Sequence, residues 1–182
     1  MRFAWLVFGA LLPTLALAQA QEEGRTSRRT SSQSQRYSVQ FTQGAAGKCT
    51  LEVQQDREKV WSWDTCVGTA EDLYFVSDKG DRVWVLHVFP EVVSNPKVKK
   101  ARADPVWDTV VAELFDRTGQ RVSSRRLRDL VTGATRDPVQ EFGRHFKWVG
   151  GAMGVSGLPP HVREGNRLEL EPNAAKPVQL DF

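Results

Sequence analysis

The side chains best able to do chemistry in this 182-residue chain are three histidines and a scatter of carboxylates. His87, His145 and His161 share no short, repeated spacing. Protein zinc sites usually draw ligands from tight spacings, so the sequence predicts no metal site, with convergence of distant histidines as the alternative. His87 alternates with its neighbours Leu86 and Val88 and is expected on the opposite face of a strand, toward solvent.

Carboxylate chemistry, such as glycoside hydrolysis, requires two acids that face each other across a cleft. The candidates Asp64, Asp104, Asp108 and Glu113 show no spacing that pairs them. Glu113 interrupts an apolar run, which indicates either a groove position or the solvent face of a strand. No Gly-x-Ser-x-Gly motif is present, and Ser156 lies in no strand-to-helix context. The sequence therefore predicts no catalytic residue and no cofactor.

The cluster Ser77-Asp78-Lys79-Gly80-Asp81 separates two runs rich in β-branched and aromatic residues, 73–77 and 82–89. A calcium loop needs acidic oxygens at alternate positions and a distant glutamate, and Asp78 and Asp81 lack that pattern. A glycine in a short loop supplies the positive φ of a tight hairpin. We therefore interpret the cluster as a turn between two strands.

The two cysteines, Cys49 and Cys66, predict one disulfide in an exported protein. Closing this loop is worth on the order of 3 kcal/mol by the chain-entropy argument. A redox pair or nucleophilic thiol would favour a Cys-X-X-Cys spacing or a helix N-terminus, and neither is evident. Direct pairing of Cys49 with Cys66 would set the apolar residues of 48–55 opposite polar ones. We therefore predict a β-bulge near Asp64-Thr65.

Candidate binding residues are aromatic or cationic. Trp61 and Trp63 alternate on one strand, either as part of the core or as a stacking platform for sugars or a partner. The basic stretches 96–102 and 121–128 could form a patch for an anionic partner, or the second could be a charged edge strand. Their cations are Lys97, Lys99, Lys100, Arg102, Arg121, Arg125, Arg126 and Arg128.

The chain begins with a secretory signal pattern. Residues 1–18 carry one cation, Arg2, then an apolar run and an Ala-Leu-Ala end. The run is shorter than the about 20 residues of a membrane-spanning helix. We expect cleavage before Gln19, or before Gln21, no transmembrane segment afterwards, and a periplasmic or extracellular location.

A leader follows at residues 19–36, rich in Ser, Arg and Gln and without aliphatic side chains from residue 21 onward. Such a segment buries too little apolar surface to offset its ordering entropy, so we expect disorder. Removing Arg2 and four leader arginines from the 25 cations leaves 20, and removing Glu22 and Glu23 from the 22 acids also leaves 20. The remainder is neutral, which argues against a nucleic-acid partner.

From residue 37 to 182 the hydrophobic pattern has a period of two. Runs of this kind recur at spacings of 8 to 15 residues and predict roughly nine or ten strands. A short helical turn is expected at 127–131, and Asp137-Pro138 could open another. The predicted fold is a single, mainly β, antiparallel meander domain, built as a sandwich, a partly open barrel or a propeller-like sheet.

Four stretches, VSDKGDRVWVL, VAELFDRTGQRVSSRRLRDLV, HFKWVGG and RLELEPNAAKPVQLDF, carry a resemblance. Their order resembles uncharacterised exported bacterial β-meander proteins with propeller-blade-like Ser-Asp-x-Gly and Asp-x-x-Gly hairpins. The resemblance covers about residues 70–182, and its motifs are mainly turn chemistry. It implies a β-meander and no activity.

Together these features predict a noncatalytic exported domain, a binding or structural module of the bacterial cell envelope. Its expected partner is an envelope protein or an anionic envelope polymer. One alternative is a small carrier that encloses an apolar ligand among Trp84, Phe89, Trp107 and Trp148. The other is an envelope hydrolase with paired carboxylates.

Overall fold

The computed structural model describes residues 26–44, 47–92, 105–132 and 137–182. Within these residues the protein is mainly β, with thirteen strands and two four-residue helices. Strands pair antiparallel and in chain order within each sheet, which confirms the mainly β meander. The count exceeds the nine or ten strands expected because β1, β9 and β11 lack a clear apolar alternation.

The N-terminal sheet has the order β1-β2-β3-β4. Its strands are β1 (Thr26–Ser31), β2 (Tyr37–Gln43), β3 (Cys49–Gln55) and β4 (Glu58–Trp63). Val39 and Phe41 of β2 face Val53 and Leu51 of β3, and all four are fully buried. The period-two pattern therefore predicted the inward face of β2 and β3 correctly.

Strand β1 corrects the expected disordered leader at 19–36. Residues 26–31 pair with β2 along their whole length, from Thr26 opposite Gln43 to Ser31 opposite Ser38. A turn at 32–36 then joins the strands, and the Ser32 side chain is buried there. Backbone hydrogen bonds hold an edge strand without aliphatic side chains, so composition alone does not reveal it. The folded part begins at least at residue 26, not at residue 37; residues 1–25 lie outside the described chain.

The predicted bulge near Asp64-Thr65 lies elsewhere. The register between β3 and β4 shifts between Val53 and Gln54, where Val60 is the extra residue of β4. This shift sets Trp61 opposite Val53 and Trp63 opposite Leu51. Strand β4 ends at Trp63, so the chain reaches Cys66 through a bend and not through a paired register.

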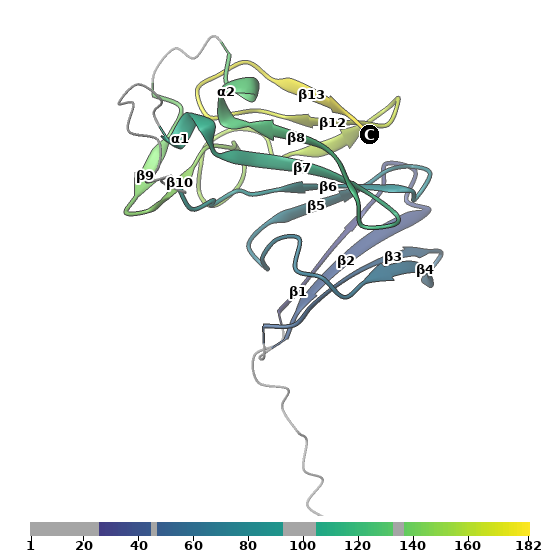
Figure 1. Cartoon of the computed structure of the whole chain (residues 1–182). Coiled ribbons are helices and arrows are strands. Elements are labelled where there is room, and N and C mark those ends of the chain that lie inside the picture. The colour runs from purple at the N-terminus through teal and green to yellow at the C-terminus, as the bar shows by residue number, and fades with distance from the viewer. Residues whose placement is uncertain (1–25, 45–46, 93–104, 133–136) are drawn as a thin grey trace, which may run out of the picture.

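The second sheet has the order β5-β6-β7-β8 and forms the middle layer of the molecule (Figure 1). Its strands are β5 (Leu73–Val76), β6 (Arg82–Leu86), β7 (Val110–Asp116) and β8 (Arg121–Arg126). Strands β5 and β6 are apolar at consecutive positions because both faces of this sheet are covered. Helices α1 (Pro105–Asp108) and α2 (Leu127–Leu130) flank β7 and β8, and α2 confirms the predicted helical turn. Proline at the first position favours the start of α1.

A sheet of β11 (His161–Arg163), β12 (Arg167–Leu170) and β13 (Val178–Asp181) forms the third layer (Figure 1). A separate hairpin of β9 (Gln140–Phe142) and β10 (His145–Lys147) lies at the side of the molecule, near α1. Strand β9 lies where Asp137-Pro138 was expected to open a helix.

Two hydrophobic cores separate the three layers. Between the N-terminal and middle sheets lie buried side chains that include Phe41, Tyr74 and Phe115. On the opposite face of the middle sheet lie others that include Trp84 and Trp148. The sheets therefore stack like the layers of a sandwich, with the middle sheet shared by both cores.

The turn between β5 and β6 is the hairpin that the sequence predicts. The Ser77 N–H donates to the Arg82 carbonyl at 3.0 Å, and the Gly80 N–H donates to the Ser77 carbonyl at 3.0 Å. Ser77 Oγ lies 2.7 Å from Asp81 Oδ1. Gly80 has a φ of +68°, in the left-handed region that glycine adopts without strain. The Asp81 carboxylate therefore serves the turn.

Candidate functional site

The two tryptophans of β4 pack inside the fold. Trp63 is 9% exposed, Trp61 is half-buried, and their rings stack with centroids 4.8 Å apart. Trp61 Nε1 donates to the Gly80 carbonyl at 2.7 Å, and Trp63 Nε1 donates to the Arg117 carbonyl at 2.9 Å. The two indoles thus bind the β5–β6 turn and the β7–β8 turn of the middle sheet. These contacts favour a role in the core over a stacking platform for sugars or a partner.

The predicted disulfide is present. Cys49 and Cys66 are bonded, with their Cα atoms 4.9 Å apart. The bond ties β3 to the segment that follows β4, across 17 positions of sequence. No free cysteine occurs among the residues the structure describes. The predicted bond is therefore confirmed, and its role as a staple of the N-terminal sheet stays a prediction.

Three of the four arginines on β8 and α2 form ion pairs. Arg121 pairs with Glu113 at 2.6 Å, and Arg126 and Arg128 both pair with Asp108. Arg125 donates to Ser123 Oγ at 2.8 Å. Strand β8 lies at the edge of the middle sheet, where charge discourages edge-to-edge association. The other cluster, Lys97, Lys99, Lys100 and Arg102, lies outside the described residues.

The chemically richest site is an ion cluster around His87. The imidazole Nδ1 lies 3.1 Å from Asp72 Oδ2, and Nε2 lies 3.1 Å from Glu113 Oε2. The second oxygen of Glu113 accepts from Arg121 at 2.6 Å. The side chains of Asp72, His87 and Glu113 are 6%, 18% and 15% exposed, so water screens these contacts weakly. The sequence did not predict this cluster, and His87 does not face open solvent as expected.

Three neighbouring strands bring the cluster together. Asp72 immediately precedes β5, His87 immediately follows β6, and Glu113 lies within β7. The His87 N–H donates to the Val111 carbonyl at 2.9 Å, which extends the ladder of β6 and β7 past the end of β6. A turn fixes Asp72, since its Oδ2 also accepts from the Thr69 N–H at 2.8 Å. The acids and the imidazole therefore have defined backbone positions.

The electrostatics of the cluster favour the imidazolium form of His87. Burial by itself lowers the pKa of His87, but the hydrogen bonds and charges of Asp72 and Glu113 outweigh it and raise the pKa to about 9. The hydrogen bond from His87 lowers the pKa of Glu113, against the opposing effect of burial, and Arg121 lowers it further. At neutral pH the cluster thus holds two cations and two anions.

This arrangement is poorly suited to acid-base catalysis. A general base needs a free lone pair within reach of substrate, but both nitrogens of His87 are engaged and protonated at neutral pH. Glu113 is shared between His87 and Arg121. Asp72 and Glu113 converge, but one imidazole lies between them where a carboxylate pair of a glycosidase would leave room for substrate. The cluster is best described as an ion network that joins three strands.

The other two histidines, His145 and His161, lie outside this ion cluster. His145 stacks on Phe89 with centroids 4.9 Å apart, and Lys147 lies over the ring of Phe142 at 4.7 Å. Within the described ranges no group of three or more His, Cys, Asp or Glu side chains could hold a metal ion. His161 is exposed on β11.

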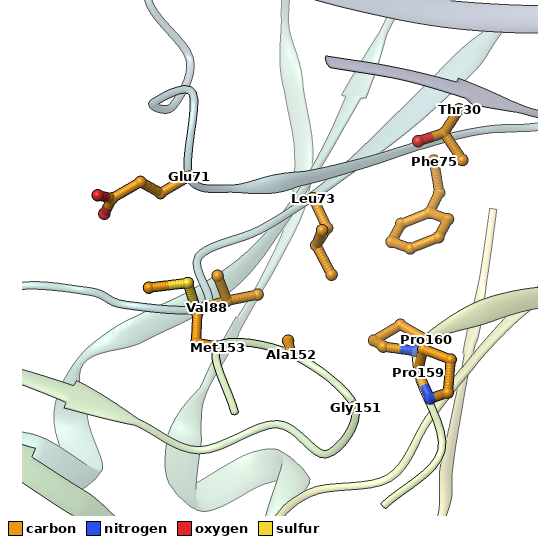
Figure 2. Close-up of a pocket in the computed structure, with 10 residues that line it drawn as sticks. All are labelled: Thr30, Glu71, Leu73, Phe75, Val88, Gly151, Ala152, Met153, Pro159 and Pro160. Carbon is orange, nitrogen blue, oxygen red and sulfur yellow. The ribbon is translucent and has the colours of Figure 1, made fainter. Parts of the chain in front are cut away.

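An apolar pocket lies on the other face of the middle sheet from the ion cluster. Figure 2 shows Leu73 and Phe75 of β5 across the pocket from Pro159 and Pro160, with Val88 beside Met153. The pocket has a volume of about 340 Å³, within the range of ligand and side-chain sites. Its remaining lining residues are Thr30, Glu71, Gly151, Ala152 and Met153.

The loop that walls this pocket is held in one conformation. Gly151 has a φ of +69°, and a Cβ there would lie 2.3 Å from the Pro159 nitrogen. The Gly151 N–H donates to the Val155 carbonyl at 2.9 Å, and Lys147 Nζ donates to the Met153 carbonyl at 2.7 Å. Met153 itself has a φ of +50° and is 36% exposed. A wall fixed in this way is preorganised, which lowers the ordering cost of binding.

A second hollow, of about 370 Å³, lies over β11, β12 and β13 and is lined by Arg163, Glu164, Arg167 and Gln179. Arg163 pairs with Glu169 at 3.2 Å, and Arg167 pairs with Asp181 at 3.0 Å. Both arginines that line this hollow are therefore already paired with acids of the same sheet.

Comparisons of the chain with protein-family models, with curated proteins and with solved structures found no match. The resemblance to exported β-meander proteins stays a prediction. Within the described residues no helix is long and apolar enough to cross a membrane.

Proposed function

We propose that this protein is a noncatalytic exported binding domain of the bacterial cell envelope. Its docking site is the apolar pocket between β5 and the 151–160 loop, and its partner is an envelope protein that inserts an apolar side chain there. The proposal follows from the geometry of that pocket, since Leu73, Phe75 and Pro160 offer apolar surface within a preformed wall.

Export is supported by two independent features. The signal pattern at residues 1–18 belongs to secreted proteins. The bond between Cys49 and Cys66 forms and persists in oxidising compartments such as the periplasm. Fractionation of a producing bacterium tests this part: the processed chain is expected in the periplasm or medium, and an unprocessed chain in the cytoplasm would contradict it.

Packing favours this proposal over the carrier alternative. Trp84 and Trp148, which would line an enclosed ligand cavity, are 1% and 0% exposed and fill the core. Their indole N–H groups already donate to the Asp181 and His87 carbonyls at 3.1 and 2.7 Å. The pocket proposed here lies instead at the surface of that core, beside Phe75 and Val88.

The pocket is tested with a neutral apolar fluorophore, N-phenyl-1-naphthylamine, titrated into the purified, oxidised protein. Saturable binding at one site is expected. Ala152→Trp, which fills the pocket, and Met153→Asp, which charges its mouth, should each weaken binding at least about tenfold, or about 1.4 kcal/mol. Aspartate tolerates the positive φ of Met153 better than most residues, so the second variant preserves the fold.

The matched control is Val122→Asp, which charges an exposed apolar residue of β8 away from the pocket. Its fluorophore affinity should equal that of the parent. Unsaturable binding, or equal affinity of the folded pocket variants and the parent, would overturn the proposal.

A further inference from the structure

We infer that the partner segment carries a lysine or arginine directly beside the apolar side chain that it inserts, and that Glu71 recognises this cation. The inference rests on the proposed function and specifies the chemistry of its partner.

The first step is the position of Glu71. It lines the pocket and is exposed, and Figure 2 shows its side chain extending outward on the side of the pocket where Met153 lies. Its backbone N–H donates to Thr69 Oγ1, which fixes the start of the side chain at the pocket mouth. An acid at the rim of an apolar hollow attracts a cation that arrives with an apolar group.

The second step is that this carboxylate is unpaired, whereas some other exposed acids of the protein have partners. Glu71 has no side-chain hydrogen bond or ion pair within the described part of the chain. Glu91 pairs with Arg144 at 2.6 Å, and Asp181 pairs with Arg167 at 3.0 Å. The charge of Glu71 is therefore available to a partner.

The third step concerns the charges around Glu71. The adjacent Asp72 points to the opposite face of the sheet, where His87 balances it. Lys147 is not among the residues that line the pocket, and its ammonium donates to the Met153 carbonyl and lies over the Phe142 ring. Glu71 is the one acidic side chain that lines the pocket within the described residues, and no cation lines it there.

The probes are three capped tripeptides that differ at one position: acetyl-Leu-Lys-Gly-amide, acetyl-Leu-Gln-Gly-amide and acetyl-Leu-Glu-Gly-amide. Binding is followed by the methyl resonances of Leu73 and Met153 at low salt. The lysine peptide should bind roughly two- to fivefold tighter than the glutamine peptide, as an exposed ion pair allows, and the glutamate peptide should bind more weakly than both. High salt should remove the difference.

Glu71→Gln should abolish the preference and leave the affinity for the glutamine peptide unchanged. The matched control, Glu58→Gln, removes an exposed acid of β4 outside the pocket and should keep the preference. Equal binding of the lysine and glutamate peptides, or a preference that survives Glu71→Gln, would overturn the inference. If no peptide binds but N-phenyl-1-naphthylamine does, the inference fails and the pocket stands. If neither binds, the proposed function fails as well.

Discussion

The indole N–H of Trp61 donates to the carbonyl of Gly80 at 2.7 Å, which ties the edge of the N-terminal sheet to the tip of the first hairpin of the middle sheet. Gly80 is buried under the ring of Tyr37, and Asp78 Oδ1 accepts from the Ser34 N–H at 2.9 Å. The Asp-Gly turn is therefore a junction between two layers of the molecule.

Gly80→Ala should destabilise the protein more than a glycine substitution at an open turn. A Cβ at residue 80 would lie 2.3 Å from Tyr37 Cδ1, and the residue also has a positive φ. Gly143 has a similar φ of +64° but nothing within 4 Å of the added Cβ. We expect Gly143→Ala to lower the free energy of unfolding by about 1 kcal/mol, and Gly80→Ala by about 2 kcal/mol more, because it must also displace Tyr37. Urea denaturation of both variants measures this, and equal losses would contradict the junction.

Removal of the disulfide should lower stability without changing the docking pocket. The double substitution Cys49→Ser and Cys66→Ser opens the loop that the bond closes between residues 17 positions apart. We expect the free energy of unfolding to fall by about 3 kcal/mol. The bond lies in the N-terminal sheet, so fluorophore affinity should equal that of the parent. An unchanged melting temperature under oxidising conditions would show that the bond is no staple.

Much of the fold could be predicted because local pattern determines it. The strand faces of β2 and β3 follow from alternation, and the hairpin at Gly80 follows from turn chemistry. Strand β1 could not be predicted in this way, since a backbone ladder to β2 holds it. The predicted position of the bulge, at Asp64-Thr65, was wrong by at least four residues, because the extra residue of β4 is Val60. Strand β4 ends at Trp63, so Cys49 and Cys66 need not pair in register and no bulge is needed beyond that point.

The ion cluster depended on long-range register, which the sequence alone does not supply. Asp72 and Glu113 lie 15 and 26 positions from His87. One signal was nevertheless available, because each lies two positions from an apolar residue that faces the first core: Tyr74, Val85 or Phe115. Polar residues at such positions are partly buried, and buried polar groups are expected to hydrogen-bond with one another. The pocket carried no comparable signal, since its wall comes from a loop remote in sequence.

His87→Ala should lower the stability of the protein more than substitution of an exposed polar residue does. It leaves Asp72 and Glu113 largely buried without their shared cation, although Arg121 still compensates Glu113 in part. We expect a loss of about 3 kcal/mol in the free energy of unfolding, the scale for breaking a buried ion pair. The exposed His161 offers a control, and His161→Ala should change stability by less than about 0.5 kcal/mol. A catalytic cluster would behave differently, with activity lost and stability kept.

The same cluster should make stability depend on pH in a defined direction. The folded-state pKa of His87, about 9, lies above the ordinary value of 6.5, so the folded protein holds this proton more tightly than the unfolded chain. Its contribution is fully present below pH 6.5 and is lost as the pH rises through 9, by about 3 kcal/mol in total. The pKa of Glu113 is lowered, so its contribution is present above the ordinary value of 4.5 and is lost as the pH falls. Urea denaturation from about pH 6 to 9 should show the decline in the parent and a flatter profile in His87→Ala. A parent profile as flat as that of the variant would mean that the imidazolium does not hold the strands together.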